Sequence, residues 1–298
     1  MIELSDDKVI FAFGAATKPV FAVRSGETVR IRTKDCFSEQ IRTYDDSLTQ
    51  IDWDAVNPAT GPIAVKGAVP GGALKVEILD IELNEQAVCS TGKGEGVYGD
   101  RLEEESFRLC AVRDGRVWWD DSLSIPVSPM IGVIGVAPAA GEVNCGTPGP
   151  HGGNMDNNKI TAGTTVYFPV FTEGALFGCG DMHAAMGNGE IGVSGAEIGG
   201  WVTLRLTAEP DLSIATPWFE TDEEIGVICS SATLDDAADD AVHAFIDRVA
   251  KRTGKDPSEL AMLFSIAGNV EVCQMVDPLR TVRFTAPKRI LDPMGFTL

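Results

Sequence analysis

The stretch GGWVTLRLTAE, residues 199–209, gives the clearest indication of the fold. Val202, Leu204 and Leu206 alternate with polar residues, and an alternation of period two predicts a strand with one buried and one solvated face. The stretch ALKVEILDIEL, residues 73–83, alternates in the same way after the turn signal VPGG. These two segments predict a chain that folds mainly as β-sheet.

Apolar runs on either side of these segments predict further strands. In KPVFAVRSGETVRIRTKDCF, residues 18–37, two runs flank a turn, and Val29 and Ile31 alternate with arginines. GRVWWDDSLSIPVSPMIGVIGVAP, residues 115–138, contains short runs separated by prolines. TTVYFPVFTEGALFGCGD, residues 164–181, is rich in valine, tyrosine and phenylalanine, which favour strands.

Helical patterns occur only near the C-terminus. In residues 233–254, Val242, Phe245, Ile246 and Val249 follow helical spacing, Thr233 precedes an acidic first turn, and a glycine follows a basic last turn. A second helix is predicted at once, with Asp256 as its N-cap and proline at its first position. After these helices, which lie near 233–267, the pattern returns to strand.

The predicted fold class is therefore mainly β, with a β-sandwich or barrel core and a small C-terminal α+β element. The longest irregular stretch, CGTPGPHGGNMDNN, covers residues 145–158. We expect a β-rich half over 1–150 and a second half over 151–298 that carries the helical pair. The two halves are expected to pack tightly as one catalytic unit.

The charge balance limits the partners. With 24 Lys+Arg against 44 Asp+Glu the net charge is −20, which repels nucleic acid and anionic membranes. The first residues, MIELSDDKVI, lack a basic region followed by an apolar run, and no stretch approaches about 20 apolar residues. We therefore expect a cytoplasmic protein with no signal peptide and no membrane span. Its many short strands favour association with further copies, as a homodimer or larger oligomer.

Cysteine and histidine are used sparingly. The seven cysteines are odd in number and form no CxxC pair, which fits reduced thiols. One of only three histidines lies in GCGDMHAAMGNGE, residues 178–190. Asp181 and His183 are two residues apart, and in an extended segment that spacing puts both side chains on one face. A carboxylate and an imidazole on one face suit a zinc-type ion. The alternative is a glycine-rich turn with a structural histidine.

Two glutamates follow this pair and offer a further ligand or a general base. Glu190 and Glu197 are an odd number of residues apart, so a bulge at Gly192 or Gly195 is needed to aim both inward. Glycines such as Gly180 leave backbone amides uncovered, so that a small ligand can approach them closely.

Two more clusters resemble the first in composition. HGGNMDNN, residues 151–158, places Asn154 and Asp156 two apart after Gly152 and Gly153, although these residues also suit a plain turn. KDCFSEQI, residues 34–41, places Asp35 beside Cys36 at the end of a strand, where a buried structural cysteine is the alternative. Each cluster puts an acid at the end of an apolar strand, which is a common way for a β scaffold to build a site.

Four segments in order resemble the acetamidase/formamidase family, and in particular its shorter branch. These are NPATGPIAVKGAVPGGALKVEILDI (57–81), HGGNMDNNKI (151–160), VYFPVFTEGALFGCGDMHAAMGNGE (166–190) and CQMVDP (273–278). The family segment reads approximately G-D-x-H-x-x-x-G-D-G-E. Asp181, His183 and Glu190 fit it, but Asn188 replaces an Asp, so position 188 is not counted as a ligand.

The resemblance implies hydrolysis of short linear amides such as formamide or acetamide to a carboxylate and ammonia, with a bound divalent metal. Zinc suits a mixed nitrogen and oxygen shell, whereas calcium or magnesium would suit oxygen alone. We expect four metal ligands, a general base at Glu190 or Glu197, and an oxyanion donor at Asn154. Gly152, Gly153 and Gly180 are expected to contact the substrate. The four ligands are Asp35, Asp156, Asp181 and His183.

Two other hypotheses remain open at the level of sequence. The first is an amidase with Cys36 as its nucleophile and Glu39 or another acid as its base. The second is a non-catalytic metal- or sugar-binding β module. Inactivation by a thiol reagent but not by a chelator would favour the first, and metal binding without turnover would favour the second.

Overall fold

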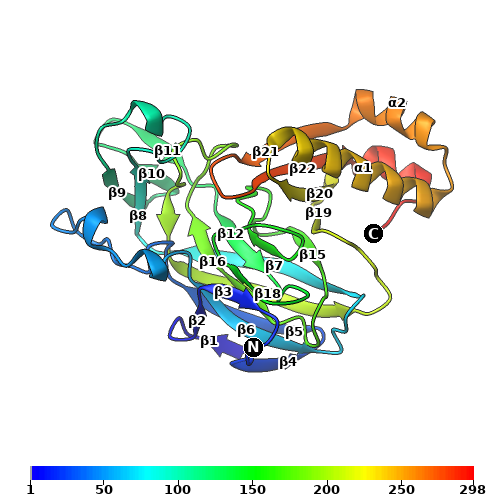
Figure 1. Ribbon diagram of the computed structural model, residues 1–298, viewed down its shortest axis with the longest axis horizontal. Coiled ribbons are helices and arrows are strands. Elements are labelled where there is room, and N and C mark those ends of the chain that lie inside the picture. The colour runs from blue at the N-terminus through cyan, green and yellow to red at the C-terminus, as the bar shows by residue number, and fades with distance from the viewer. Residues whose placement is uncertain (1) are drawn as a thin grey trace.

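Two large β-sheets pack face to face in the computed structural model, which describes residues 2–298 (Figure 1). Within those residues, the first sheet has nine strands in the order β1-β5-β18-β7-β15-β19-β20-β22-β21. Their bounds are Ile2–Leu4, Glu27–Thr33, Gly200–Glu209, Ala73–Leu83, Thr165–Pro169, Trp218–Glu220, Glu224–Ser231, Arg280–Pro287 and Asn269–Gln274.

The second sheet has eleven strands in the part of the chain that the structure describes, and eight of them follow the order β11-β10-β9-β8-β17-β16-β12-β14. Their bounds are Ser124–Pro126, Arg116–Trp118, Ser106–Arg113, Gln86–Thr91, Glu197–Ile198, Phe177–His183, Met130–Gly135 and Gly152–Asn154. β6 (Ala59–Lys66) continues this sheet beside β16 and pairs with β2 (Val9–Ile10) and β4 (Phe21–Arg24). β3 (Ala12–Gly14) and β13 (Glu142–Asn144) form a separate pair.

β18 confirms the alternation from which the fold was predicted. It lies between β5 and β7 and pairs antiparallel with both. Val202, Leu204 and Leu206 are fully buried on its inner face. On the outer face Trp201 is covered by the guanidinium of Arg30, 4.4 Å from the ring centroid. The mainly β fold is thus confirmed, with a sandwich as its core.

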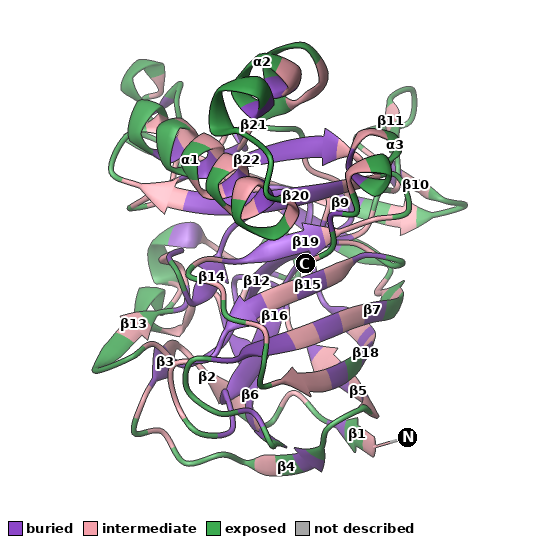
Figure 2. Ribbon diagram, turned by 90° about the vertical axis from the view of Figure 1, so that its right-hand side faces the viewer, coloured by how far each residue is buried: buried purple, intermediate pink, exposed green. Residues whose placement is uncertain are grey.

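The main core lies between the two sheets. Apolar side chains of β5, β7, β15 and β18 meet those of β6, β12 and β16 in one continuous cluster. Figure 2 shows β6, β12 and β16 largely as buried, whereas β7 and β15 alternate between buried and more exposed residues. β16 is buried along its whole length, and it is the strand that carries Asp181 and His183.

The C-terminal helices pack on one end of the first sheet and confirm the predicted α+β element (Figure 1). α1 (Leu234–Thr253) has Thr233 as its N-cap, and Gly254 ends it in the left-handed conformation. α2 (Pro257–Ala267) has Asp256 as its N-cap and proline in its first turn. Their apolar faces enclose a second core around Phe245 against β20 and β22. A short third helix, α3 (Lys288–Leu291), was not predicted.

Both sheets combine strands from the two predicted halves. In the first sheet β18 pairs with β5 and β7, and in the second sheet β16 pairs with β6. The division of the chain at residue 150 stays a prediction.

None of the described helices is long and apolar enough to cross a membrane.

The segment between β5 and β6 matters for the site. It contains two short 3₁₀ helices, Leu48–Gln50 and Trp53–Ala55, and packs against β8 and β9 through Phe37, Ile41 and Leu48. Cys36 lies near the start of this segment and is buried in the same cluster.

The aromatic cluster of the second core is expected to contribute strongly to the stability of the protein. Phe245 is fully buried and lies 4.9–6.3 Å, centroid to centroid, from Trp218, Phe264, Phe284 and Phe296. Phe245→Ala is expected to lower the free energy of unfolding by about 3–5 kcal/mol, since it leaves a cavity among rings that cannot collapse. Urea denaturation measures this. Ile266→Ala, at a position 85% exposed on α2, should change it by less than about 0.5 kcal/mol.

Candidate functional site

β16 positions the Asp181–His183 pair in the middle of the second sheet. It pairs with β12 on one side and with β6 and β17 on the other. Asp181 has a φ of 51°, in the left-handed region, which aspartate tolerates better than most residues. Gly132 of β12 lies across from it. A Cβ there would come within 2.8 Å of Asp181 Oδ2 and 2.5 Å of Asp156 Oδ1, so glycine leaves room for two carboxylates.

His183 is the centre of a buried group of carboxylates. Its Nε2 lies 3.1 Å from Glu197 Oε2, 3.5 Å from Asp181 Oδ1 and 3.7 Å from Asp156 Oδ1. All four side chains are at most 2% exposed. Gly195 gives the ring its space, since a Cβ at that position would come within 2.5 Å of His183 Nδ1.

Asp156 and Glu190 reach the group from loops. Both have left-handed φ angles, 44° and 47°. Glu190 begins a turn in which the Val193 amide donates to the Glu190 carbonyl, and β17 starts later at Glu197. The two glutamates therefore do not share one strand with a bulge, as the spacing had suggested. A turn brings both toward the site instead.

The donor atoms fit a divalent cation. Asp156, His183 and Glu190 form one group whose ligand atoms lie within 4.8 Å of one another, and Cys36, Asp181 and Glu197 form another. Several of these atoms make no hydrogen bond to any described residue: both Asp156 carboxylate oxygens, Asp181 Oδ1, Glu197 Oε2 and His183 Nδ1. Buried carboxylate oxygens without partners are costly, and a cation between them would satisfy them. Imidazole nitrogen with carboxylate oxygen is a donor set that zinc accepts.

Burial and mutual repulsion raise the pKa of three of the four acids around His183. Burial raises the pKa of Asp156 to about 7 and that of Glu197 to about 8. Burial, together with the charge of Asp156, holds the pKa of Glu190 well above its ordinary value. Asp181 differs, because its contact with His183 outweighs the effect of burial and lowers its pKa. The group thus carries more acid than its one imidazole can balance.

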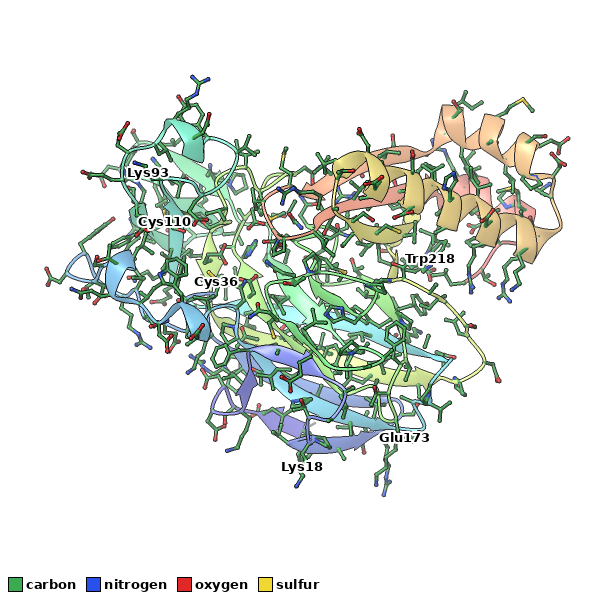
Figure 3. The ribbon with its side chains drawn as sticks, in the orientation of Figure 1. Lys18, Cys36, Lys93, Cys110, Glu173 and Trp218 are labelled. Atoms are coloured by element: carbon green, nitrogen blue, oxygen red, sulfur yellow. The ribbon has the colours of Figure 1, made fainter. Side chains whose placement is uncertain are left out.

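Asp35 and its neighbour Cys36 lie in different surroundings. Asp35 Oδ1 accepts a hydrogen bond from the Glu39 amide at 2.8 Å, and Asp35 belongs to neither ligand group. Cys36 lies inward, where the segment after β5 meets the sheets (Figure 3). Burial, and then the charges of Glu197 and Asp181, raise the pKa of its thiol well above the ordinary value. Asp35 as a ligand stays a prediction.

The predicted substrate-binding glycines serve close packing of the backbone. A Cβ at Gly180 would come within 2.0 Å of the Pro58 carbonyl, at Gly152 within 2.3 Å of that of Ile134, and at Gly153 within 2.4 Å of that of Thr147. None of the three lines the cavity beside the acids. Their role in substrate binding stays a prediction.

A cavity of about 140 Å³ opens beside the acids and reveals one residue that sequence reasoning missed. Asp277 lines it and accepts a hydrogen bond from Asn154 Nδ2 at 3.0 Å, while Asn154 Oδ1 is buried without a partner. Burial and the nearby Asp156 raise the pKa of Asp277 well above its ordinary value. Asp277 lies in the connection between β21 and β22, just before a proline, so the pattern of an acid near a strand end could have indicated it.

The sequence pattern of the acetamidase/formamidase family matches residues 12–144 and 137–233, more than half of the chain. The chain belongs to the acetamidase/formamidase family. The acetamidase of Mycolicibacterium smegmatis is 26% identical, over 62% of this chain and 62% of its own length. The chain therefore spans less than two thirds of that relative.

Two crystal structures of the family are similar over nearly the whole chain. A predicted acetamidase/formamidase from Thermoanaerobacter tengcongensis is 47% identical with a TM-score of 0.98, and the match covers 100% of this chain and 99% of that one. The acetamidase of Bacillus halodurans is 43% identical with a TM-score of 0.97, covering 99% of this chain and 100% of that one.

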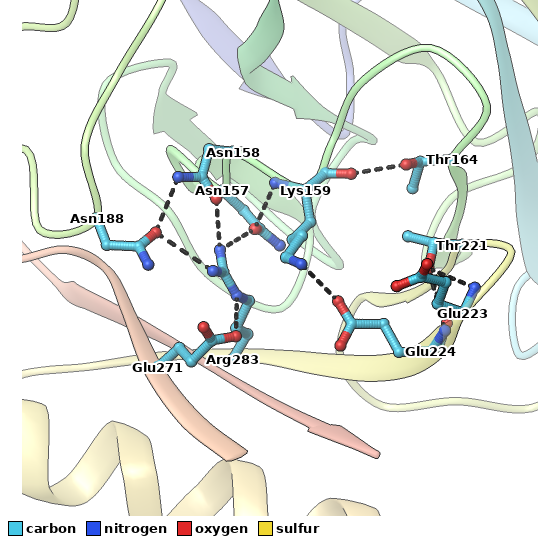
Figure 4. Close-up of polar contacts among 10 residues, drawn as sticks. All are labelled: Asn157, Asn158, Lys159, Thr164, Asn188, Thr221, Glu223, Glu224, Glu271 and Arg283. Atoms are coloured by element: carbon cyan, nitrogen blue, oxygen red, sulfur yellow. Dashed lines mark hydrogen bonds and ion pairs between the residues drawn. The ribbon is translucent and has the colours of Figure 1, made fainter. Parts of the chain in front are cut away.

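In this member of the family a buried arginine holds the two loops that carry Asp156 and Glu190 (Figure 4). Arg283 of β22 is 1% exposed, and its Nη1 donates to Asn157 Oδ1 at 2.7 Å and Asn158 Oδ1 at 2.9 Å. Its Nη2 donates to Asn188 Oδ1 at 3.2 Å, and its Nε pairs with Glu271 at 3.0 Å. Asn188, where the family pattern has Asp, thus binds Arg283.

His151 lies apart from the acids. It packs edge-on against Phe13, with ring centroids 5.4 Å apart, and its Nε2 is buried without a partner. Burial lowers its pKa from 6.5 to about 4. This histidine is therefore neutral in the folded protein near neutral pH, and it belongs to neither ligand group.

Arg283→Met is expected to lower the free energy of unfolding by about 3 kcal/mol, because it leaves the Glu271 carboxylate and the Asn158 amide oxygen without their donor. Asn157 Oδ1 and Asn188 Oδ1 keep one weaker, uncharged donor each, the Lys159 amide and Asn158 Nδ2. Urea denaturation measures this change. The matched control is Arg205→Met, since the exposed Arg205 also reaches a carboxylate, Glu77, at 3.4 Å. It should lose less than about 1 kcal/mol. Equal losses would contradict the role of the network.

His151 makes the stability depend on pH. The folded protein resists protonation of His151 until the pH nears 4, whereas the unfolded chain takes up the proton near 6.5. Stability is therefore complete above pH 6.5 and falls as the pH drops toward 4, by at most about 3 kcal/mol from this group. Unfolding free energies of the wild type and His151→Gln at pH 7 and pH 5 measure it. The variant should lose less between the two pH values; an identical loss would exclude His151 as the source.

Proposed function

We propose that the protein hydrolyses small linear amides to a carboxylate and ammonia. The observation that carries this proposal is the buried group of unpartnered acid oxygens around His183, which borders a cavity in a member of the acetamidase/formamidase family. The activities in the names of the relatives support the reaction type.

We propose that Asp156, Asp181 and His183 hold a divalent cation, with zinc the best match to nitrogen and oxygen donors. When bound, such an ion polarises a carbonyl and makes water more acidic. Glu197 is then a positioning group, because its Oε1 already accepts the Gly195 amide at 2.6 Å and its Oε2 faces His183.

Glu190 is the proposed general base. It lines the cavity, and one of its carboxylate oxygens lies within 4.8 Å of a ligand atom of Asp156 and of His183. Glu190 would take a proton from the attacking water as its oxygen bonds to the amide carbon. It would then give that proton to the nitrogen as the carbon–nitrogen bond breaks, so that ammonia leaves. The second N–H of Asn154, beyond the one that binds Asp277, can donate to the carbonyl oxygen as charge develops there.

His183→Ala is expected to lose the bound metal and the release of ammonia from acetamide, while the fold persists. Elemental analysis of the purified protein, an ammonia assay and circular dichroism measure the three properties. His243→Ala, at an exposed position on α1, is the matched control and should retain all of them. Full activity in a metal-free His183→Ala protein would exclude the metal mechanism.

Glu190→Gln separates a base from a ligand in the same assays. The variant should keep its metal and lose about 10²–10⁴-fold in kcat. Loss of metal would instead make Glu190 a ligand and leave Glu197 as the base.

Cys36→Ser tests the alternative hypothesis that the Cys36 thiol is the nucleophile. It should retain activity, since a buried thiol among acids is poorly ionised.

A further inference from the structure

The cavity at the candidate site has two unlike sides. One side is formed by acids and Asn154, the polar groups proposed above to act on an amide. The other side is apolar. Phe37, Leu48, Trp53 and Val56 come from the segment between β5 and β6, and Val193 comes from the turn after Glu190. A ligand that fills this space must therefore combine a polar end with an apolar body.

The volume of the cavity limits the size of the whole ligand, its polar end and its apolar body together. It is about 140 Å³. An engineered protein cavity of about 150 Å³ lined by apolar side chains takes up benzene, whereas one water occupies about 30 Å³ of liquid. Formamide has no carbon substituent and would leave the apolar wall facing water. An amide of about benzene size in total, with a branched aliphatic substituent, would fill the space and cover the wall.

The charge around the cavity excludes one class of amide. Asp181, Glu190, Glu197 and Asp277 line it, and Glu95 and Glu105 add acid from the loops beside β8 and β9. No lysine or arginine of residues 2–298 lines it. A substrate that carried its own carboxylate would meet repulsion with no cation from a side chain to offset it.

A second hollow of about 720 Å³ adjoins the cavity. The wall that the two spaces share limits how far a substrate can extend in that direction. Ser90, Thr91, Glu190 and Ser194 line both spaces. Ser194 Oγ fixes this wall to β8, because it accepts from the Ser90 amide at 2.8 Å and donates to the Ser90 carbonyl at 3.1 Å. A group that extended toward the second hollow would have to displace that wall.

We propose that the preferred substrate is an uncharged amide with a compact, branched aliphatic substituent, so that the whole molecule is about the size of benzene. This inference rests on the proposed amide hydrolysis and narrows it from the smallest amides to a substrate class. Recognition comes from burial of the substituent against Phe37, Leu48 and Val56, while the acids act on the amide group.

The metal-loaded full-length protein is tested for ammonia release with a series of primary amides. The series is formamide, acetamide, isobutyramide, 3-methylbutyramide, benzamide and 2-naphthamide, with succinamate as the anionic member. We expect kcat/KM to rise about fourfold for each buried methylene, from about 0.8 kcal/mol per CH₂. It should peak at isobutyramide or 3-methylbutyramide and fall for benzamide, 2-naphthamide and succinamate.

Variants of the apolar wall test whether this cavity sets the preference. Val56→Trp fills the space, and it should lower the ratio of kcat/KM for 3-methylbutyramide to that for acetamide by about tenfold or more. Val20→Trp is the matched control, since Val20 is 42% exposed and lines neither hollow. Its ratio should equal that of the wild type.

The outcomes separate this inference from the proposed function. Highest kcat/KM for formamide or acetamide, or an unchanged ratio in Val56→Trp, would overturn the substrate class and leave amide hydrolysis intact. Release of ammonia from no member of the series would overturn amide hydrolysis itself. A peak at isobutyramide or 3-methylbutyramide that Val56→Trp removes would support both, whereas a peak at benzamide or 2-naphthamide would overturn the substrate class.

Discussion

The concentration of buried acid around one imidazole is the constraint on which the rest of the structure depends. Asp156, Asp181, Glu190 and Glu197 are each at most 7% exposed, and His183 is the one basic side chain beside them among the described residues. Burying that many carboxylates is unfavourable unless protons or a cation balance them. Stability alone gives no reason for such an arrangement, so the group is best understood as a site whose charge is completed by a ligand.

The scaffold is rigid where this unfavourable group lies. β16 is buried throughout and pairs on both sides, and Gly132 and Gly195 leave room for carboxylate and imidazole that any side chain would take away. Arg283 ties the loops of Asp156 and Glu190 to β22, far along the chain. Fixed geometry is what a group of like charges needs, because a loose site would relax apart.

The functional side chains and the apolar wall come from different layers. The acids around His183 are held by strands and tight turns of the second sheet, whereas the wall comes mainly from the irregular segment between β5 and β6. A change at an apolar wall residue of that segment, such as Leu48 or Val56, is therefore expected to alter the size of the cavity more than the positions of the acids. This separation is common where loops on a rigid sheet determine which ligand fits.

The sequence alone determined the strands, the two capped helices and the closeness of Asp181 and His183, because each follows from local periodicity and spacing. Only the tertiary structure brought Asp277 against Asn154, placed Asp35 outside both ligand groups and turned the chain at Glu190. It also decided that glycines 152, 153 and 180 pack against backbone carbonyls. These features depend on which distant strands lie side by side, and neither alternation nor spacing along the chain contains that information.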